Sequence, residues 1–152
     1  MNRQSKYPDT HCFHYHNANP KNRITCDCWL RAICTGLDEP YNDVLREMVQ
    51  VHLDTGYEMS SDKAVEKYLS SKGWVKHKQP RRMDGAKFTG AQFCNSVECF
   101  LRHGIRSAEG IVASNRIIAN IGGHHMVAIV DAKVYDIWDS TDKCIGNYWT
   151  KK

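Results

Sequence analysis

The sequence contains no hydrophobic stretch long enough to cross a membrane and no recognisable secretory leader. Its longest apolar run is far shorter than the ~18 residues that a membrane-spanning helix needs. The first twenty residues, MNRQSKYPDTHCFHYHNANP, lack the apolar segment of a signal peptide. We therefore expect a cytoplasmic protein that has no membrane partner.

A disulfide framework and a strong net charge are also missing. An odd number of cysteines, seven, in a chain without a leader favours reduced thiols in a reducing compartment. The formal net charge is only +4, and the basic residues are scattered except in the run KHKQPRR, Lys76 to Arg82. We interpret that run as a solvated loop, and we do not expect a nucleic-acid partner.

No internal repeat or low-complexity segment divides the chain. The 152 residues, 41% hydrophobic and 25% charged, have the composition of one ordinary soluble globular domain. We therefore predict a single domain over residues 1–152, in which residues 1–21 form a polar, His-rich lead-in.

Helical and strand patterns occupy different parts of the sequence. Helical spacing of apolar residues, bounded by caps and glycines, predicts helices over 27–34, 39–54, 60–73 and 89–104, the first of them ended by Gly36. Short β-branched runs predict strands over 109–114, 116–121, 124–131 and 133–140, and residues 74–78 predict one more short strand. Because strands follow helices rather than alternate with them, the fold class is α+β, with N-terminal helices packed on a C-terminal antiparallel β-sheet.

One cysteine lies where a helix would activate it. In the stretch TCDCWLRAIC, Asp27 is a good helix N-cap, and this places Cys28 at the first helical position. The positive end of the helix dipole favours the thiolate there, and the thiolate is the nucleophile. Cys26 is the alternative, but it precedes the cap and lies outside the helix. We prefer Cys28.

A nucleophilic cysteine needs a base and a group that orients the base. The segment GGHHMVAIVDAKVYDIWDS places His125 at the head of an apolar strand, followed by a turn and a second strand that ends in Asp139. Because strand ends far from a hairpin turn meet, His125 and Asp139 are expected to lie side by side. His124 would project to the opposite face. Asp136 is the alternative acid, but it is nearer the turn.

These segments resemble the papain-like cysteine peptidase superfamily. CDCW at a helix start, GHHMVAIV and YDIWDS match the Cys-Trp, the His-headed strand and the Asn-Ser or Asp-Ser pair of that superfamily. The chain is most similar to small bacterial and phage members, which carry a D-C-x-x-R-A helix start and a G-H-x-V-A-V strand. The single residue between Cys26 and Cys28 and the short sequence separation from Cys28 to His125 depart from the papain pattern.

The resemblance implies a papain-like core, a Cys28–His125–Asp139 catalytic triad, and Asn22 as the oxyanion-hole amide six positions before the nucleophile. It implies acyl transfer to water on a protein or peptide substrate, at a peptide, isopeptide or amide bond, with no cofactor. A glutamine substrate would make the protein a deamidase, and an amine acceptor a transferase. A bacterial or phage source would place it in the bacterial or host cytoplasm.

Two other functions use the same residues differently. A papain-like scaffold without turnover could bind a host or phage factor. A zinc-stabilised nucleic-acid binder could use His11, Cys12, His14 and His16 with Cys26, because sulfur and imidazole suit zinc. The spacing matches neither the paired C-x2-C nor the H-x3-H unit of ordinary structural zinc sites, so no metal site is expected.

Overall fold

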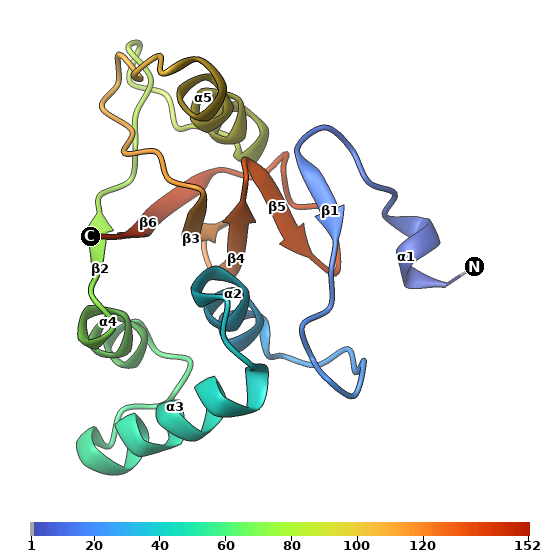
Figure 1. Ribbon diagram of the computed structural model, residues 1–152, viewed down its shortest axis with the longest axis vertical. Coiled ribbons are helices and arrows are strands. Elements are labelled where there is room, and N and C mark those ends of the chain that lie inside the picture. Colours follow the sequence, from blue (N-terminus) through green and yellow to red (C-terminus); the bar gives the residue numbers. More distant parts are fainter. Residues whose placement is uncertain (1) are drawn as a thin grey trace.

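The fold is taken from a computed structural model, which describes residues 2–152. Over these residues the chain forms five helices and six strands (Figure 1). In chain order they are α1 (Arg3–Lys6), β1 (Phe13–Tyr15), α2 (Cys28–Leu37), α3 (Tyr41–Thr55), α4 (Asp62–Ser71), β2 (Trp74–His77), α5 (Gly90–His103), β3 (Arg116–Ile121), β4 (His125–Val130), β5 (Lys133–Asp136) and β6 (Ile145–Lys151). None of the described helices is long and apolar enough to span a bilayer.

The strands form one mixed sheet in the order β1-β5-β4-β3-β6-β2. The four C-terminal strands pair antiparallel, as predicted, with β4 between β5 and β3. Two edge strands come from elsewhere in the chain: β1 pairs parallel with β5, and β2 pairs antiparallel with β6. The sheet is therefore neither purely antiparallel nor purely C-terminal, and this corrects the prediction.

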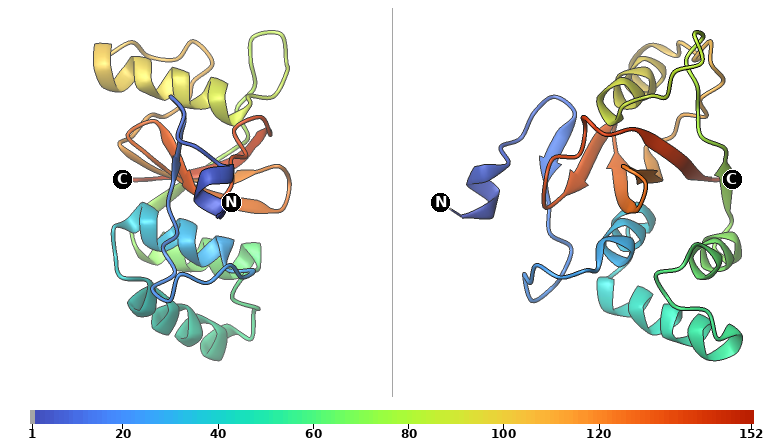
Figure 2. Two further views of the ribbon diagram at one scale, coloured as in Figure 1. Left: turned by 90° about the vertical axis from the view of Figure 1, so that its right-hand side faces the viewer. Right: turned by 180° about the vertical axis from the view of Figure 1, so that it is seen from behind.

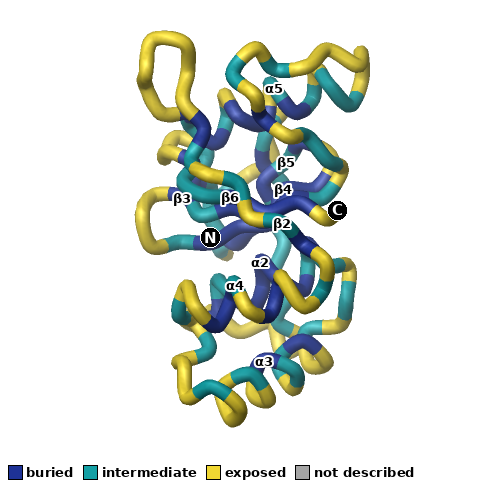
Figure 3. The backbone as a smooth tube through the Cα atoms, turned by 90° about the vertical axis from the view of Figure 1, so that its left-hand side faces the viewer, coloured by how far each residue is buried: buried dark blue, intermediate teal, exposed yellow. Residues whose placement is uncertain are grey.

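Helices cover both faces of the sheet. Helices α2, α3 and α4 lie on one side, and α5 lies alone on the other (Figures 1 and 2). The α+β class is confirmed, but the arrangement has three layers where we expected helices on one face. Two buried clusters fill the two interlayer spaces, one around Phe93, Val127 and Ile129 and one around Ile33, Met48 and Ile118. Figure 3 shows this burial concentrated in the sheet and the helix faces that meet it.

Helix α2 positions the candidate nucleophile, and a glycine sets how close it lies to the sheet. The helix packs mainly on β4 and also contacts β3 and β5. We expected Gly36 to end it, but the helix continues to Leu37, and Asp38 in the left-handed conformation caps it. A Cβ at Gly36 would lie only 2.4 Å from Cγ1 of Ile118. Gly36 is thus required by close packing of the helix on the sheet, and the stop signal is the residue after Leu37.

The β4–β5 hairpin is tighter than its sequence suggests. Val130 pairs with Lys133, so only Asp131 and Ala132 form the turn, and both have positive φ (48° and 64°). This is the backbone of a type I′ turn, which normally carries Asn or Gly. After Asp136 the chain bends away at residues 137–138 and leaves the sheet. The strand predicted to run to Asp139 or beyond therefore ends earlier.

Candidate active site

Cys28 is the first residue of α2, as predicted, and its side chain is half-buried. Asp27 is the N-cap residue, but its side chain makes no capping hydrogen bond to the helix. The Asp27 carboxylate instead accepts from Arg31, Tyr41 and Asn19. The Asp27 side chain therefore leaves the N–H groups of the first helical turn without a capping partner from the N-cap residue.

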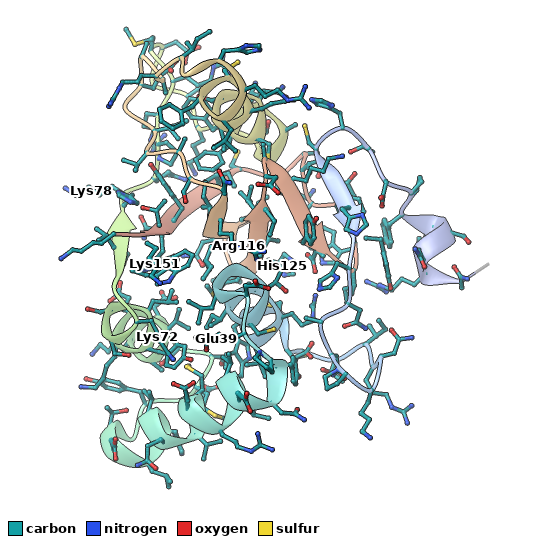
Figure 4. The ribbon with its side chains drawn as sticks, viewed as in Figure 1. Glu39, Lys72, Lys78, Arg116, His125 and Lys151 are labelled. Atoms are coloured by element: carbon teal, nitrogen blue, oxygen red, sulfur yellow. The ribbon has the colours of Figure 1, made fainter. Side chains whose placement is uncertain are left out.

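His125 is the first residue of β4, and its ring lies close enough to Cys28 to lower the pKa of the thiol. The backbone N–H of Met126 lowers the same pKa. The His125 side chain is 16% exposed, and the Trp138 ring lies against it with 4.9 Å between centroids. The thiol and the imidazole are thus brought together from opposite parts of the sequence, in a position that solvent still reaches (His125 is labelled in Figure 4).

The acid that holds His125 is Asp136, not Asp139. Asp136 Oδ2 and His125 Nε2 lie 2.5 Å apart, and the Asp136 side chain is 1% exposed. The physical reason is the length of β5. Because β5 ends at Asp136 and the chain bends at once, Asp136 reaches the head of β4, whereas Asp139 has already left the sheet.

Asp139 has a different part in the fold. Its Oδ1 accepts from the backbone N–H of Thr141 at 2.9 Å and from the Thr141 hydroxyl at 2.6 Å. Such bonds fix the turn that leads from β5 towards β6. Asp139 is thus a turn residue, and its predicted contact with His125 is wrong.

The electrostatics of the pair favour a thiolate and an imidazolium. Burial raises the pKa of the Cys28 thiol, but hydrogen bonds from His125 and the Met126 N–H, with the charges of His125 and Arg31, outweigh it and lower the pKa below its usual value. Burial works against the charged His125 ring, but the hydrogen bonds to Asp136 and Cys28 raise its pKa to about 9. Each partner therefore stabilises the charged form of the other.

A buried arginine that the sequence reasoning did not single out connects the two acids of the site. Arg31 Nε donates to Asp27 Oδ1 at 2.9 Å, and Arg31 Nη1 donates to Asp136 Oδ1 at 2.5 Å. The Arg31 side chain is only 6% exposed. The i, i+4 spacing of Asp27 and Arg31 on a helix was a signal for the first contact. No local pattern could have indicated the second, which spans 105 positions.

Asn22, the expected oxyanion-hole amide, is exposed and occupied elsewhere. Its Oδ1 accepts from the Asn17 side chain at 3.3 Å, and its backbone N–H donates to the Asn19 carbonyl. Its backbone has φ of 53°, in the left-handed region that asparagine tolerates. These contacts fix a loop before α2, and none of them directs the Asn22 amide at Cys28.

The remaining candidates lie apart from this pair. Cys26 is exposed, and His124 lies in the exposed turn between β3 and β4. His11 bonds to Glu98 at 2.6 Å, and His14 bonds to Asp9 at 2.7 Å. Within residues 2–152 no three His, Cys, Asp or Glu side chains are placed to hold one metal ion. The zinc alternative therefore lacks a ligand set in the described part of the chain.

A polar cavity of about 660 Å³ lies at the same end of the sheet. Gly122 and Gly123 line it, and they belong to the β3–β4 turn that leads into His125. The amide side chains of Gln79, Asn120 and Asn147 also line it. This cavity therefore adjoins the turn that precedes His125.

Comparison with family models, curated proteins and solved structures finds no match for this chain. The chemistry of the site is therefore argued from the site's own geometry.

Proposed function

We propose that the protein is a cysteine-dependent hydrolase that cleaves a peptide, isopeptide or amide bond through a covalent acyl-enzyme. Cys28 is the nucleophile, His125 its proton partner and Asp136 the acid that orients His125. The observation that carries this proposal is the arrangement at the N-terminus of a helix, where Cys28 lies beside His125 and His125 bonds Asp136. Nucleophile, base and orienting group in mutual reach are the signature of an activated nucleophile.

The tautomer of His125 follows from its contacts. Since Nε2 bonds Asp136, the other ring nitrogen, Nδ1, is the one that serves Cys28. In the neutral pair Nε2–H donates to the carboxylate and Nδ1 accepts from the thiol. When the proton moves to Nδ1, the ring becomes an imidazolium that donates on both sides, and Asp136 stabilises it without taking the proton.

The reaction divides into two steps that balance. The Cys28 thiolate adds to the carbonyl carbon; the tetrahedral intermediate then collapses as the His125 imidazolium gives its proton to the leaving amine. This leaves a thioester on Cys28 and a neutral His125. His125 next removes a proton from water, which attacks the thioester and releases the carboxylic acid and the Cys28 thiol.

Backbone N–H groups supply the oxyanion hole in this proposal. The Cys28 N–H is at the first helical position, and the Asp27 carboxylate does not occupy the first-turn donors. Such a donor is worth ~10²–10³ in rate when it meets the developing oxyanion. The role that the family resemblance assigned to Asn22 is not needed.

The resemblance to papain-like peptidases adds to this proposal. A cysteine at a helix start, a histidine at the head of a strand and an acid after the following strand occur here in the order that the family uses. The acid stands at Asp136, three positions earlier than the resemblance implied. The proposed substrate is a protein or peptide. The proposed location is the bacterial cytoplasm, which is the host cytoplasm if a phage encodes the protein.

A hydrolase, a deamidase and a transferase would all form the same thioester on Cys28, so a deamidase or a transferase is the alternative with the same chemistry. A binding protein without turnover is the alternative with no chemistry at Cys28. A pH series of iodoacetamide alkylation, read by peptide mass spectrometry, distinguishes the proposed enzyme from a binding protein. The proposal requires Cys28 to react first and at a pH where Cys26 and Cys144 do not. Equal labelling of all exposed cysteines would contradict it. A peptide and peptide-amide library then distinguishes cleavage from release of ammonia.

A further inference from the structure

Arg31 lies one helical turn beyond Cys28 and is buried between two carboxylates. It is held by Asp27 on its own helix and by Asp136 at the end of β5, and the side chains of both acids are themselves no more than 11% exposed. A buried guanidinium is retained only where its charge and its N–H groups are paired. Both pairing acids adjoin the site: Asp27 precedes Cys28, and Asp136 holds His125.

We propose that Arg31 is the positioning residue of this site, which fixes the Asp136 carboxylate in the orientation that holds His125 towards Cys28. This inference rests on the function proposed above and adds a residue that does not touch the reacting atoms. Arg31 acts on His125 through Asp136, and on the helix that carries Cys28 through Asp27.

The contacts of Asp136 show why a second partner matters. Its Oδ2 meets His125, while its Oδ1 accepts from Arg31 at 2.5 Å and from its neighbouring Ile137 N–H at 2.7 Å. Both oxygens are thus committed, and the carboxylate plane cannot rotate without breaking a charged hydrogen bond. If Arg31 were neutral, Asp136 Oδ1 would keep a single backbone donor, and the carboxylate would keep only His125 as a counter-charge.

The planar fork of arginine suits this task better than lysine would. Nε and Nη1 point at two different acids, and a guanidinium offers those donors in a fixed geometry. A lysine ammonium keeps the charge but is a compact point that cannot satisfy both carboxylates from fixed directions. Substitution by lysine therefore separates the charge of Arg31 from its geometry.

The charged and titratable groups that surround Arg31 and the catalytic pair come from several elements. They are Cys28 and Cys34 of α2, Asp27 at its N-cap, Tyr41 of α3, His125 of β4, Asp136 of β5, and His16, which follows β1. The positive charge of Arg31 also acts on Cys28, whose pKa it helps to lower. Neutralising Arg31 thus removes one source of thiolate stabilisation directly and weakens another, because the His125–Asp136 pair is less well ordered.

The test combines three variants with two measurements on the full chain. Arg31→Gln removes the charge, Arg31→Lys keeps it, and Arg116→Gln is the matched control. Arg116 donates to the Thr35 carbonyl at 2.7 Å at the opposite end of α2 (Arg116 is labelled in Figure 4). The first measurement is the pH profile of Cys28 alkylation. The second is the downfield proton NMR signal of the His125 Nε2–H in its hydrogen bond to Asp136.

We expect Arg31→Gln to move the acid limb of the alkylation profile to higher pH and to lower the rate at pH 6 about tenfold, the effect of a rise of one in the thiol pKa. Arg31→Lys should restore most of that rate but broaden or remove the downfield signal, because the carboxylate is no longer held from two directions. Arg116→Gln should change neither measurement.

The outcomes separate this inference from the proposed function. An ordinary thiol profile for Cys28 in the unsubstituted protein defeats both. A depressed profile that Arg31→Gln leaves unchanged, in a folded variant, overturns the role of Arg31 and leaves the function standing. If Arg31→Gln does not fold, Arg31→Lys decides. A full downfield signal with a lysine at this position means that Arg31 supplies charge alone and that the positioning role is wrong.

Discussion

Asp136 and His125 lie 11 positions apart in the sequence and face each other across the open end of a hairpin, with 2.5 Å between Oδ2 and Nε2. The two-residue turn and the short β5 produce this contact, because the acid is the last residue of its strand and the histidine the first of its own. Four predictions follow from this pair and from the helix that packs against it.

His125 should control the reactivity of Cys28. His125→Ala removes the hydrogen bond and the charge that lower the thiol pKa, so the acid limb of Cys28 alkylation should move to higher pH. His124→Ala, in the exposed β3–β4 turn, should leave the limb where it is. Iodoacetamide kinetics with peptide mass spectrometry measures both. A shift caused by His124→Ala and not by His125→Ala would refute the assignment of the base.

Asp136 and Asp139 should differ sharply in their effect on catalysis. Asp136→Asn keeps the shape but lets an amide face His125, so His125 is no longer oriented as an imidazolium; turnover should fall by ~10²-fold or more, the scale of general acid–base catalysis. Asp139→Ala should leave turnover near its original level and lower the free energy of unfolding by about 1 kcal/mol, because it removes the acceptor of the two Thr141 hydrogen bonds. Equal losses of turnover in the two variants would contradict this.

His125 should titrate far above an ordinary histidine. Burial opposes the charged ring, but Asp136 and Cys28 raise its pKa from 6.5 to about 9, so the ring should stay protonated through neutral pH and lose its proton near pH 9. Cys28→Ser removes one of the two supporting partners and should lower that pKa. Histidine ring signals in an NMR pH titration report both. A midpoint near 6.5 in the unsubstituted protein would count against the ion pair.

Gly36 should tolerate no larger residue. The new Cβ of Gly36→Ala would meet Ile118 Cγ1 at 2.4 Å, and overpacking of this kind typically costs ~1–3 kcal/mol of unfolding free energy. Thr35→Ala, on the same helix, is the control for helix propensity. In a double-mutant cycle with Ile118→Ala, the loss caused by Gly36→Ala should shrink, since the clashing atoms are gone. Additive losses in urea denaturation would show that the clash is not the cause.

Local patterns were sufficient for the elements that carry the nucleophile and the base. Helical spacing after Asp27, the Ser61 cap of α4 and the glycine after α5 all mark real element ends, because caps and turns depend on neighbouring residues. The head of β4 at His125 was likewise predictable. These are also the places where Cys28 and His125 sit.

The predictions that were wrong or missing concern features that depend on contacts between residues distant in sequence. Residues 109–114 were expected to form a strand, but they form a connection in which Ile111 is buried and the Val112 N–H donates to the Tyr148 hydroxyl. The end of β5 was misplaced because Ile137 and Trp138 continue an apolar pattern while the backbone bends. The Arg31–Asp136 pair spans 105 positions, and no periodicity in one segment can reveal it.

The order of strands in the sheet has a consequence for synthesis on the ribosome. Cys28 is made early, while β4 and β5, which carry His125 and Asp136, are made late, and β6 is later still although it lies inside the sheet between β3 and β2. Until β6 is added, β2 has no partner strand in the sheet. In the proposed mechanism, the Cys28 thiol of the nascent polypeptide therefore has neither His125 nor Asp136 beside it until β4 and β5 have been made.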